Sequence, residues 1–267
     1  MVKLAEGTNV LVPAGIDQDF KITPNQLRDA ITARTRLIII CSPSNPTGSV
    51  YTRDELQGLV DVLKDYPDIT IIADEIYQHI NFTGSFTSLG AFPEIADRVV
   101  VVNGVSKAYA MTGWRIGFIA APMPVAKAVT KLQSQYTSNP SSVAQKAAEA
   151  AYNGPQDCVE EMRVAFERRR NLVVELAKEI PGIGVNVPQG AFYLFPKVSS
   201  YFGKKYGDRV ISNDSDLAMY LLEEGHVATV AGEAFCLPGY IRLSYATSDD
   251  NIREAMRRIA EALAKLS

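Results

Sequence analysis

Two basic residues that stand eight positions apart could act on one small ligand. Lys107 comes five residues after the valine run 99–102, and Arg115 follows it after the segment Ala-Tyr-Ala-Met-Thr-Gly-Trp. A lysine amine can hold an aldehyde as a Schiff base, and a guanidinium binds a phosphate through two parallel hydrogen bonds. Pyridoxal 5'-phosphate (PLP) carries both groups, so the pair favours a PLP site over a solvated loop.

An acidic residue ends another apolar run. Asp74 follows residues 69–73, Ile-Thr-Ile-Ile-Ala, and a carboxylate at the end of a buried strand is costly without a partner. In a PLP site the partner would be the pyridinium nitrogen, which must stay protonated for the ring to accept electrons. The alternative is that Asp74 caps a following helix. Tyr77, three residues on, could bind the hydroxyl of the cofactor ring or could simply pack.

Two further polar residues complete the candidate site. Asn45 lies in the turn 42–48, Ser-Pro-Ser-Asn-Pro-Thr-Gly, directly after the apolar run 37–41. We expect its amide to face the cofactor ring and the Asn45-Pro46 bond to be cis. Arg242 lies in an alternating segment, 240–245, where it could bind the α-carboxylate of an amino acid or face solvent.

Alternating strands and helices must position these residues. Short runs rich in Val and Ile predict buried parallel strands at 9–12, 37–41, 69–73, 99–102 and 116–120. Thr23 with Pro24, and Thr52 with Glu55 as a capping box, predict the starts of two helices. The carboxyl ends of parallel strands are where ligands bind in such a sheet, and the candidate residues follow three of these runs.

The pattern changes after Gly154. A long helix is expected at 156–179, strands at 184–187, 191–195 and 240–245, and helices at 214–224 and from 249 onward. We therefore expect an α/β fold with two domains. Residues 1–154 would form a cofactor domain around a mostly parallel, doubly wound sheet, and residues 155–267 would form a smaller α+β domain that includes the long helix.

Composition restricts the partners. With 27 Lys and Arg against 30 Asp and Glu, the net charge is −3, which argues against a nucleic-acid or anionic-membrane surface. The first residues lack the apolar core of a signal peptide, and no apolar run is long enough to span a bilayer, so we expect a cytoplasmic protein. The 3 cysteines and 2 histidines lack the spacing of a disulfide framework or metal site.

The sequence resembles the class I aminotransferases of the fold-type-I PLP family, specifically the bacterial aspartate aminotransferase branch. The shared segments occur in family order at 42–48, 74–77 (Asp-Glu-Ile-Tyr), 106–107 (Ser-Lys) with 113–117 (Gly-Trp-Arg-Ile-Gly), 190–193 (Gly-Ala-Phe-Tyr) and 241–244 (Ile-Arg-Leu-Ser). The resemblance also implies that about a third of the family's length, on the N-terminal side, is lacking here, including a phosphate-binding loop and a ring-stacking aromatic residue.

The resemblance implies a role for each candidate residue. Lys107 would be the Schiff-base and proton-transfer lysine and Asp74 the partner of the pyridinium nitrogen. Asn45 and Tyr77 would bind the ring oxygen. Phosphate ligands would be Arg115 and Ser106. The α-carboxylate of the substrate would bind Arg242, with Asn45 also on the substrate side.

The reaction implied is transfer of an amino group from an amino acid, expected to be aspartate, to a 2-oxo acid, expected to be 2-oxoglutarate, by a homodimer. Two alternatives stay open. The chain could be a catalytically weak or inactive fragment of such an enzyme, or a PLP-dependent β-eliminating lyase that shares the same residues. A hydrolase using Ser106 is disfavoured because no oxyanion-hole arrangement accompanies it.

Overall fold

The structure is a computed structural model that describes residues 2–267. The chain divides into two compact units. The sheet unit comprises residues 35–171 and 188–193, and the second unit comprises residues 1–34, 172–187 and 194–267.

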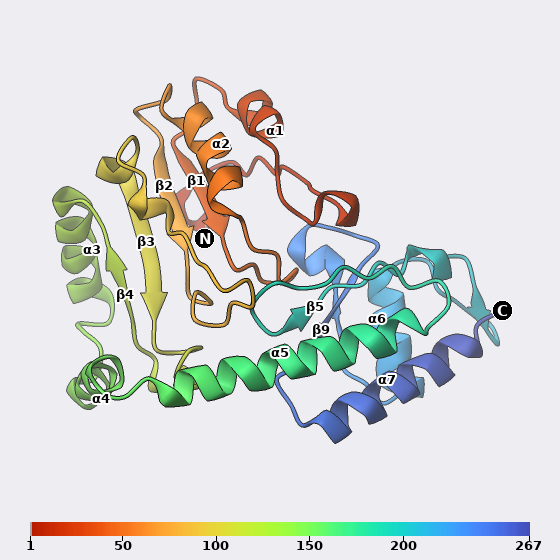
Figure 1. Cartoon of the computed structure of the whole chain (residues 1–267). Helices are drawn as coiled ribbons and strands as arrows, with labels where there is room; N and C mark the ends of the chain where they lie inside the picture. Colours follow the sequence, from red (N-terminus) through yellow and green to blue (C-terminus); the bar gives the residue numbers. More distant parts are fainter. Residues whose placement is uncertain (1) are drawn as a thin grey trace. The chain divides into compact units, whose positions relative to one another are not determined.

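A four-stranded sheet in the order β1-β2-β3-β4 forms the centre of the sheet unit (Figure 1). Strands β1 (Leu37–Cys41), β2 (Thr70–Asp74) and β3 (Val99–Gly104) are parallel, as the apolar runs predicted. Strand β4 (Gly117–Ala120) is antiparallel to β3, which corrects the expectation of a fifth parallel strand. The connection 105–116 contains no α-helix, and a parallel return would need a longer crossover.

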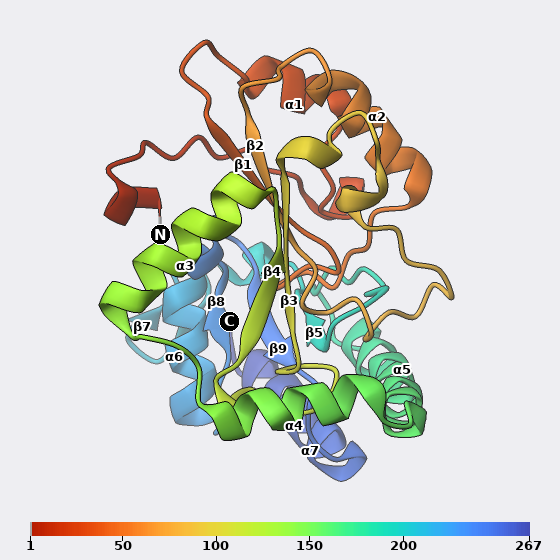
Figure 2. The same ribbon diagram turned by 90° about the vertical axis from the view of Figure 1, so that its left-hand side faces the viewer.

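The helices of the sheet unit differ in how much they bury. Helix α2 (Arg53–Leu63) begins at the expected capping box and buries Leu56, Leu59, Val60, Val62 and Leu63. Helices α3 (Met123–Tyr136) and α4 (Ser142–Asn153) lie beside β4, as Figure 2 shows, and only Ala144 of the two is buried. Helix α5 (Asp157–Lys178) follows, and the division between units falls after its residue Asn171.

The second unit contains helices and short strands. Its helices are α1 (Pro24–Ala30), α6 (Asp214–Glu224) and α7 (Asp249–Ala264). One small sheet has the order β5-β9-β8, from β5 (Tyr193–Leu194), β9 (Ile241–Ser244) and β8 (Val230–Ala231), with the division between units falling inside β5. Strands β6 (Lys205–Tyr206) and β7 (Arg209–Val210) pair as a hairpin.

Two predicted strands are not formed. Residues 9–12 have no regular structure, and residues 184–187 contribute only an isolated bridge between Gly184 and Lys197. In both segments most side chains are exposed or half-buried. These apolar runs therefore do not pair with a neighbouring strand in a buried sheet. The 3-10 helices of the chain are short turns at 2–5, 16–18, 89–91, 96–98, 112–114, 199–201 and 232–235.

The two units do not follow the single cut expected at residue 154. Residues 1–34 belong with the C-terminal part, because Phe20 packs edge-on against Phe195 and Tyr240 at 5.7 and 5.4 Å between ring centres. The amide of Ile16 also donates a hydrogen bond to the Tyr240 hydroxyl at 3.4 Å. No helix within residues 2–267 combines the length and the apolar character needed to cross a membrane.

Candidate active site

Three strand ends lie at the same level of the sheet. In the strand register Cys41 is opposite Asp74, and Asp74 is opposite Val102. The alignment continues one residue further, since the amide of Ser42 donates to the carbonyl of Asp74 at 3.1 Å and the amide of Glu75 donates to that of Val102 at 2.9 Å. The loops that carry Asn45, Asp74 and Lys107 therefore leave the sheet at one edge.

The first of these loops, residues 42–48, is a tight turn. The amide of Gly48 donates to the Ser44 carbonyl at 2.9 Å, and both X-Pro bonds of the loop are cis, including the expected Asn45-Pro46 bond. Gly48 has a positive φ of 69°, and a Cβ there would come within 2.5 Å of Pro188. Only glycine fits this position. The loop leaves Asn45 exposed.

Cys41 lies just ahead of this turn, at the end of β1. Its thiol donates to the Pro43 carbonyl at 3.4 Å. Burial, together with the nearby carboxylate of Asp74, raises the pKa of Cys41 to about 12. The thiol is therefore a neutral hydrogen-bond donor at physiological pH rather than a nucleophile.

Asp74 is half-buried at the end of β2. Its Oδ1 accepts a hydrogen bond from the amide of Ile76 at 3.3 Å, and the segment after it is a turn and not an α-helix. Asp74 is therefore not a helix cap. Its neighbour Glu75 has a structural role. Glu75 is buried and accepts hydrogen bonds from Ser88 Oγ at 2.8 Å and from the amide of Leu89 at 3.1 Å. Burial raises the pKa of Glu75.

Tyr77 is buried, with 3% of its surface exposed. Its hydroxyl lies 3.0 Å from that of Tyr193, and its ring packs edge-on against Phe192 at 5.5 Å between centres. Burial raises the pKa of Tyr77 well above its ordinary value, so this phenol keeps its proton.

Lys107 is half-buried, and its ammonium faces aromatic rings. The Nζ atom lies 5.6 Å from the centre of the Tyr77 ring and 5.7 Å from that of Phe192, both within cation–π range. Residues 105–112, the lysine loop, are closed by hydrogen bonds within the loop. The amide of Ala110 donates to the Lys107 carbonyl at 3.3 Å, and Thr112 Oγ1 donates to the Ser106 carbonyl at 3.0 Å.

A buried amide joins the loop after β2 to the loop after β3. Asn103 Nδ2 donates to Gln78 Oε1 at 2.5 Å, and its Oδ1 accepts the amide of Gly104 at 2.8 Å. Gln78 is next to Tyr77, and Gly104 leads into the lysine loop. The tyrosine and the lysine are thus held in one hydrogen-bonded frame.

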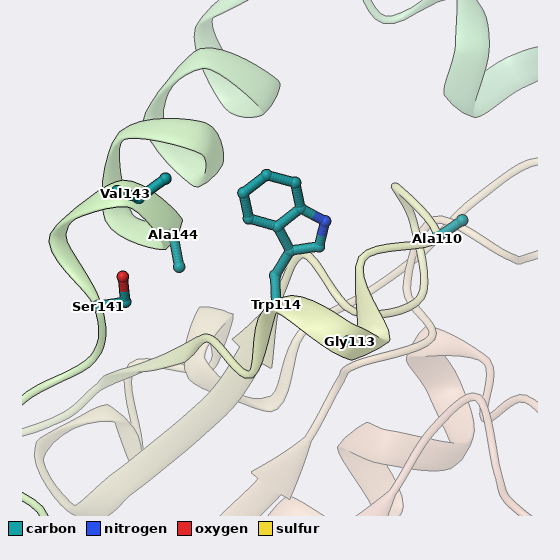
Figure 3. A pocket seen from close by; sticks show the side chains of 6 residues that line it. All are labelled: Ala110, Gly113, Trp114, Ser141, Val143 and Ala144. Carbon is teal, nitrogen blue, oxygen red and sulfur yellow. The ribbon is translucent and has the colours of Figure 1, made fainter.

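Arg115 and Ser106 lie on either side of Lys107 in sequence. Arg115 has a left-handed backbone, with φ 54°, is exposed, and donates from Nη1 to the Thr112 carbonyl at 3.0 Å. Ser106 is half-buried. The same loop borders an open hollow of about 440 Å³ in which, as Figure 3 shows, Trp114 faces Val143 and Ala144 of α4.

Arg242 belongs to the second unit. It lies on β9 opposite Val230, and its guanidinium is 4.9 Å from the centre of the Phe235 ring. Among the predicted site residues, Asn45, Asp74, Tyr77, Ser106, Lys107 and Arg115 are all in the sheet unit.

Sequence reasoning gave no role to two residues at this site: Phe192, whose ring lies beside Lys107, and Tyr193, whose hydroxyl lies beside that of Tyr77. They reach the site because residues 188–193 run between two loops of the sheet unit. The amide of Gly190 donates to the Gly48 carbonyl at 2.9 Å, and the amide of Ala191 donates to that of Ile80 at 2.8 Å. The only sequence signal was the motif Gly-Ala-Phe-Tyr at 190–193, which is 83 residues from Lys107 at its first position.

Comparison with known proteins identifies the family. Residues 1–259 match the family described as aminotransferase class I and II. The aspartate/prephenate aminotransferase of Nitrosomonas europaea is 48% identical over 98% of this chain and 67% of its own length, and that of Cereibacter sphaeroides is 48% identical over 100% of this chain and 68% of its own. The chain thus spans about two thirds of these relatives.

Solved structures agree. The crystal structure of the aspartate aminotransferase from Rhizobium meliloti superposes with a TM-score of 0.95 at 43% identity, covering 100% of this chain and 67% of that one. The aromatic aminotransferase from Pyrococcus horikoshii gives 0.90 at 35% identity, covering 98% and 69%.

The chain belongs to the class I and II aminotransferases. Its fold is that of the fold-type-I PLP-dependent enzymes, and the cofactor of this family is PLP. The residues present suit that group. One sheet edge offers an amine, a carboxylate and a phenol that stays protonated, and a guanidinium lies on the same loop as the amine.

Proposed function

We propose that this chain binds PLP and transfers the amino group of aspartate to 2-oxoglutarate. The observation that carries the proposal is the sheet edge at which three parallel strand ends are in register, with the amine of Lys107 against the ring of Tyr77. The choice of aspartate follows the names of similar proteins, which are aspartate or aspartate/prephenate aminotransferases.

Bound PLP would supply an aldehyde that takes up an amino group and a ring that accepts an electron pair. Lys107 would hold the aldehyde, release it to the incoming amino acid, and then act as the general base that removes the α-proton. The faces of Tyr77 and Phe192 would limit where its amine can swing, so that the amine stays close to the proton it moves.

The other residues would orient the ring. Asp74, half-buried and with one oxygen occupied by the Ile76 amide, would place its remaining carboxylate oxygen against the ring nitrogen and keep that nitrogen protonated. Asn45 and Tyr77 would bind the ring oxygen, with Tyr77 as donor because its phenol keeps its proton.

Polar and positively charged side chains would bind the anionic groups of the cofactor and the substrate. Arg115 and Ser106, which flank Lys107 in sequence, would bind the phosphate. Arg242 would bind the α-carboxylate of the substrate through two parallel hydrogen bonds, and Asn45 would be a second substrate ligand. This clamp would set the α C–H bond perpendicular to the ring and so favour proton removal.

The test starts with a spectrum. Purified protein is mixed with PLP, and the absorbance of lysine-linked cofactor is recorded, followed by oxaloacetate formation from aspartate with and without 2-oxoglutarate. The proposal requires both the lysine-linked band and product that depends on the 2-oxo acid. Pyruvate, ammonia and sulfide released from cysteine without an acceptor would instead indicate a β-eliminating lyase. Absence of band and product would indicate an inactive fragment.

We also propose that the chain is a cytoplasmic homodimer. Exposed apolar side chains between residues 114 and 143 of the sheet unit support dimerisation, because exposed apolar surface marks interaction sites. They are Trp114, Phe118, Met123, Val129, Leu132, Tyr136 and Val143. The mass measured by light scattering on a sizing column should correspond to two chains, and a mass of one chain at micromolar concentration would contradict the proposal.

A further inference from the structure

We propose that Tyr193 is a positioning residue, which acts through Tyr77 on the cofactor ring. The inference rests on the proposed function, since it gives Tyr193 a task at the same site. The two hydroxyl oxygens are 3.0 Å apart, the bond is buried, and Tyr193 and Tyr77 expose 7% and 3% of their surfaces.

The position of Tyr193 is fixed by its own segment. Residues 188–193 are held on both sides, because the amides of Gln189 and Gly190 both donate to the Gly48 carbonyl, at 2.8 and 2.9 Å, and the amide of Phe82 donates to the Gln189 carbonyl at 2.8 Å. Arg170 of α5 donates to the carbonyl of Pro188. The backbone that carries Tyr193 is therefore held in place by hydrogen bonds, so the position of its hydroxyl is fixed independently of Tyr77.

The environment around the pair is aromatic. Phe192 lies 5.5 Å from Tyr77 and 4.7 Å from Tyr193 between ring centres, and Phe166 stacks on Phe192 at 5.3 Å. In such surroundings a hydrogen bond between two phenols is stronger than in water, and the loss of one partner is felt by the other. The pair thus acts as a unit.

The direction of the bond decides what the pair can do. A hydroxyl has one proton to donate and two lone pairs to accept with. If Tyr193 donates to the oxygen of Tyr77, the proton of Tyr77 is left to be donated to the negatively charged oxygen of the cofactor ring. Donation into Tyr77 also polarises its O–H bond and makes it a better donor. In this arrangement Tyr193 strengthens a contact that it does not itself make.

The measurement is a pH titration of the absorbance of the lysine-linked cofactor in three variants. Tyr193→Phe removes one hydroxyl and keeps the ring. Tyr77→Phe removes the direct contact. The matched control is Tyr220→Phe, which removes another buried hydroxyl, one that donates to the Ala262 carbonyl at 2.7 Å in the second unit.

A donor at the ring oxygen stabilises its negative charge most when the lysine-linked nitrogen has lost its proton, so weaker donation moves the titration midpoint upward. We expect a shift of about 0.3–0.5 pH units for Tyr193→Phe and about 1 unit for Tyr77→Phe. Tyr220→Phe should titrate as the wild type. Thermal unfolding of the cofactor-free proteins checks that Tyr193→Phe and Tyr220→Phe lower stability by similar amounts. A shift seen with Tyr193→Phe and not with Tyr220→Phe is then not a folding effect.

The outcomes separate the two proposals. If Tyr77→Phe shifts the midpoint while Tyr193→Phe leaves it unchanged or lowers it, the role of Tyr193 is wrong and the proposed function stands. If the wild type gives no lysine-linked absorbance, the proposed function fails and the role of Tyr193 falls with it. The inference is supported if the titration midpoint moves upward in Tyr193→Phe and in Tyr77→Phe but not in Tyr220→Phe.

Discussion

Two stretches of the sheet unit contain apolar residues but bury them very differently. Residues 40–109, which we call the covered half, include α2, β2 and β3, and buried side chains recur throughout them. In residues 110–158, the open half with β4, α3 and α4, only Ala144 is buried. Figure 1 shows α2 at the β1 and β2 side of the sheet and α3 at the β4 end.

The difference teaches that apolar spacing alone does not create a core. Strand β3 is paired on both sides, with β2 and β4, whereas β4 pairs with β3 alone at the end of the sheet. Helix α3 has apolar residues, including Leu132 at 59% exposed, and none of them is buried. The covered half holds the lysine loop up to Tyr109, and the open half begins directly after it.

The largest expected difference between the halves is catalytic. Lys107→Ala should lower the rate of amino transfer by roughly 10⁴-fold or more, because both the covalent link and the proton transfer are lost. Lys127→Ala, on the exposed surface of α3, should leave the rate unchanged. Steady-state assays of both variants measure this. Reduction with borohydride followed by mass spectrometry should attach the cofactor to Lys107 only, and attachment elsewhere would break the assignment.

Stability should show the second contrast. Leu59 is fully buried on α2, so Leu59→Ala should reduce the free energy of unfolding by about 2–5 kcal/mol through lost burial and a residual cavity. Leu132→Ala on α3 removes the same atoms from a site that is exposed in the single chain, and in protein dilute enough to be monomeric it should cost less than about 0.5 kcal/mol. Urea unfolding of the two variants tests the pair, and equal losses would mean that Leu132 is covered in solution.

Thiol chemistry sharpens the comparison without any substitution. Only the thiolate reacts, and with a pKa of about 12 Cys41 holds roughly one thiolate in 10⁴ at pH 8. Cys158, at the end of the open half, is exposed. In a time course with iodoacetamide, peptide mass spectrometry should show Cys41 reacting at least about 10²-fold more slowly than Cys158. Similar rates in the folded protein would contradict the burial of Cys41.

The smallest effect concerns helix starts. Thr52 accepts a hydrogen bond from the amide of Glu55 and completes a capping box, so Thr52→Ala should cost about 1 kcal/mol. Ser141 stands at the same position of α4 and makes no side-chain cap bond, so Ser141→Ala should change the free energy of unfolding by less than about 0.5 kcal/mol. Thermal unfolding in parallel resolves the two, and the reverse order would be inconsistent with the caps described.

Local signals in the sequence predicted much of the chain up to the lysine. The valine and isoleucine runs predicted β1, β2 and β3, and the capping residues Thr23 and Thr52 predicted the starts of α1 and α2, because both kinds of signal act over a few neighbouring residues. The positions of Asn45, Asp74 and Lys107 after parallel strands followed from the same reasoning. Their chemical roles stay predictions.

Features that depend on distant partners could not be predicted. The direction of β4 is set by its pairing with β3, and α3 and α4 were not assigned from the sequence. The grouping of residues 1–34 with the C-terminal part arises from the packing of Phe20 on Phe195 and Tyr240. Phe192 is brought to Lys107, and Tyr193 to Tyr77, by backbone hydrogen bonds to loops more than a hundred residues earlier.

Residues 188–193 are hydrogen-bonded to loops that come much earlier in the chain, so the site is completed in a fixed order as the chain is synthesised. A ribosome that has released the chain as far as residue 171 has delivered every strand of the four-stranded sheet and the lysine itself. Phe192 and Tyr193 are at that moment still inside the ribosome. The nascent chain can form its sheet early, but the pocket for the reactive amine closes only after Phe192 and Tyr193 have left the exit tunnel.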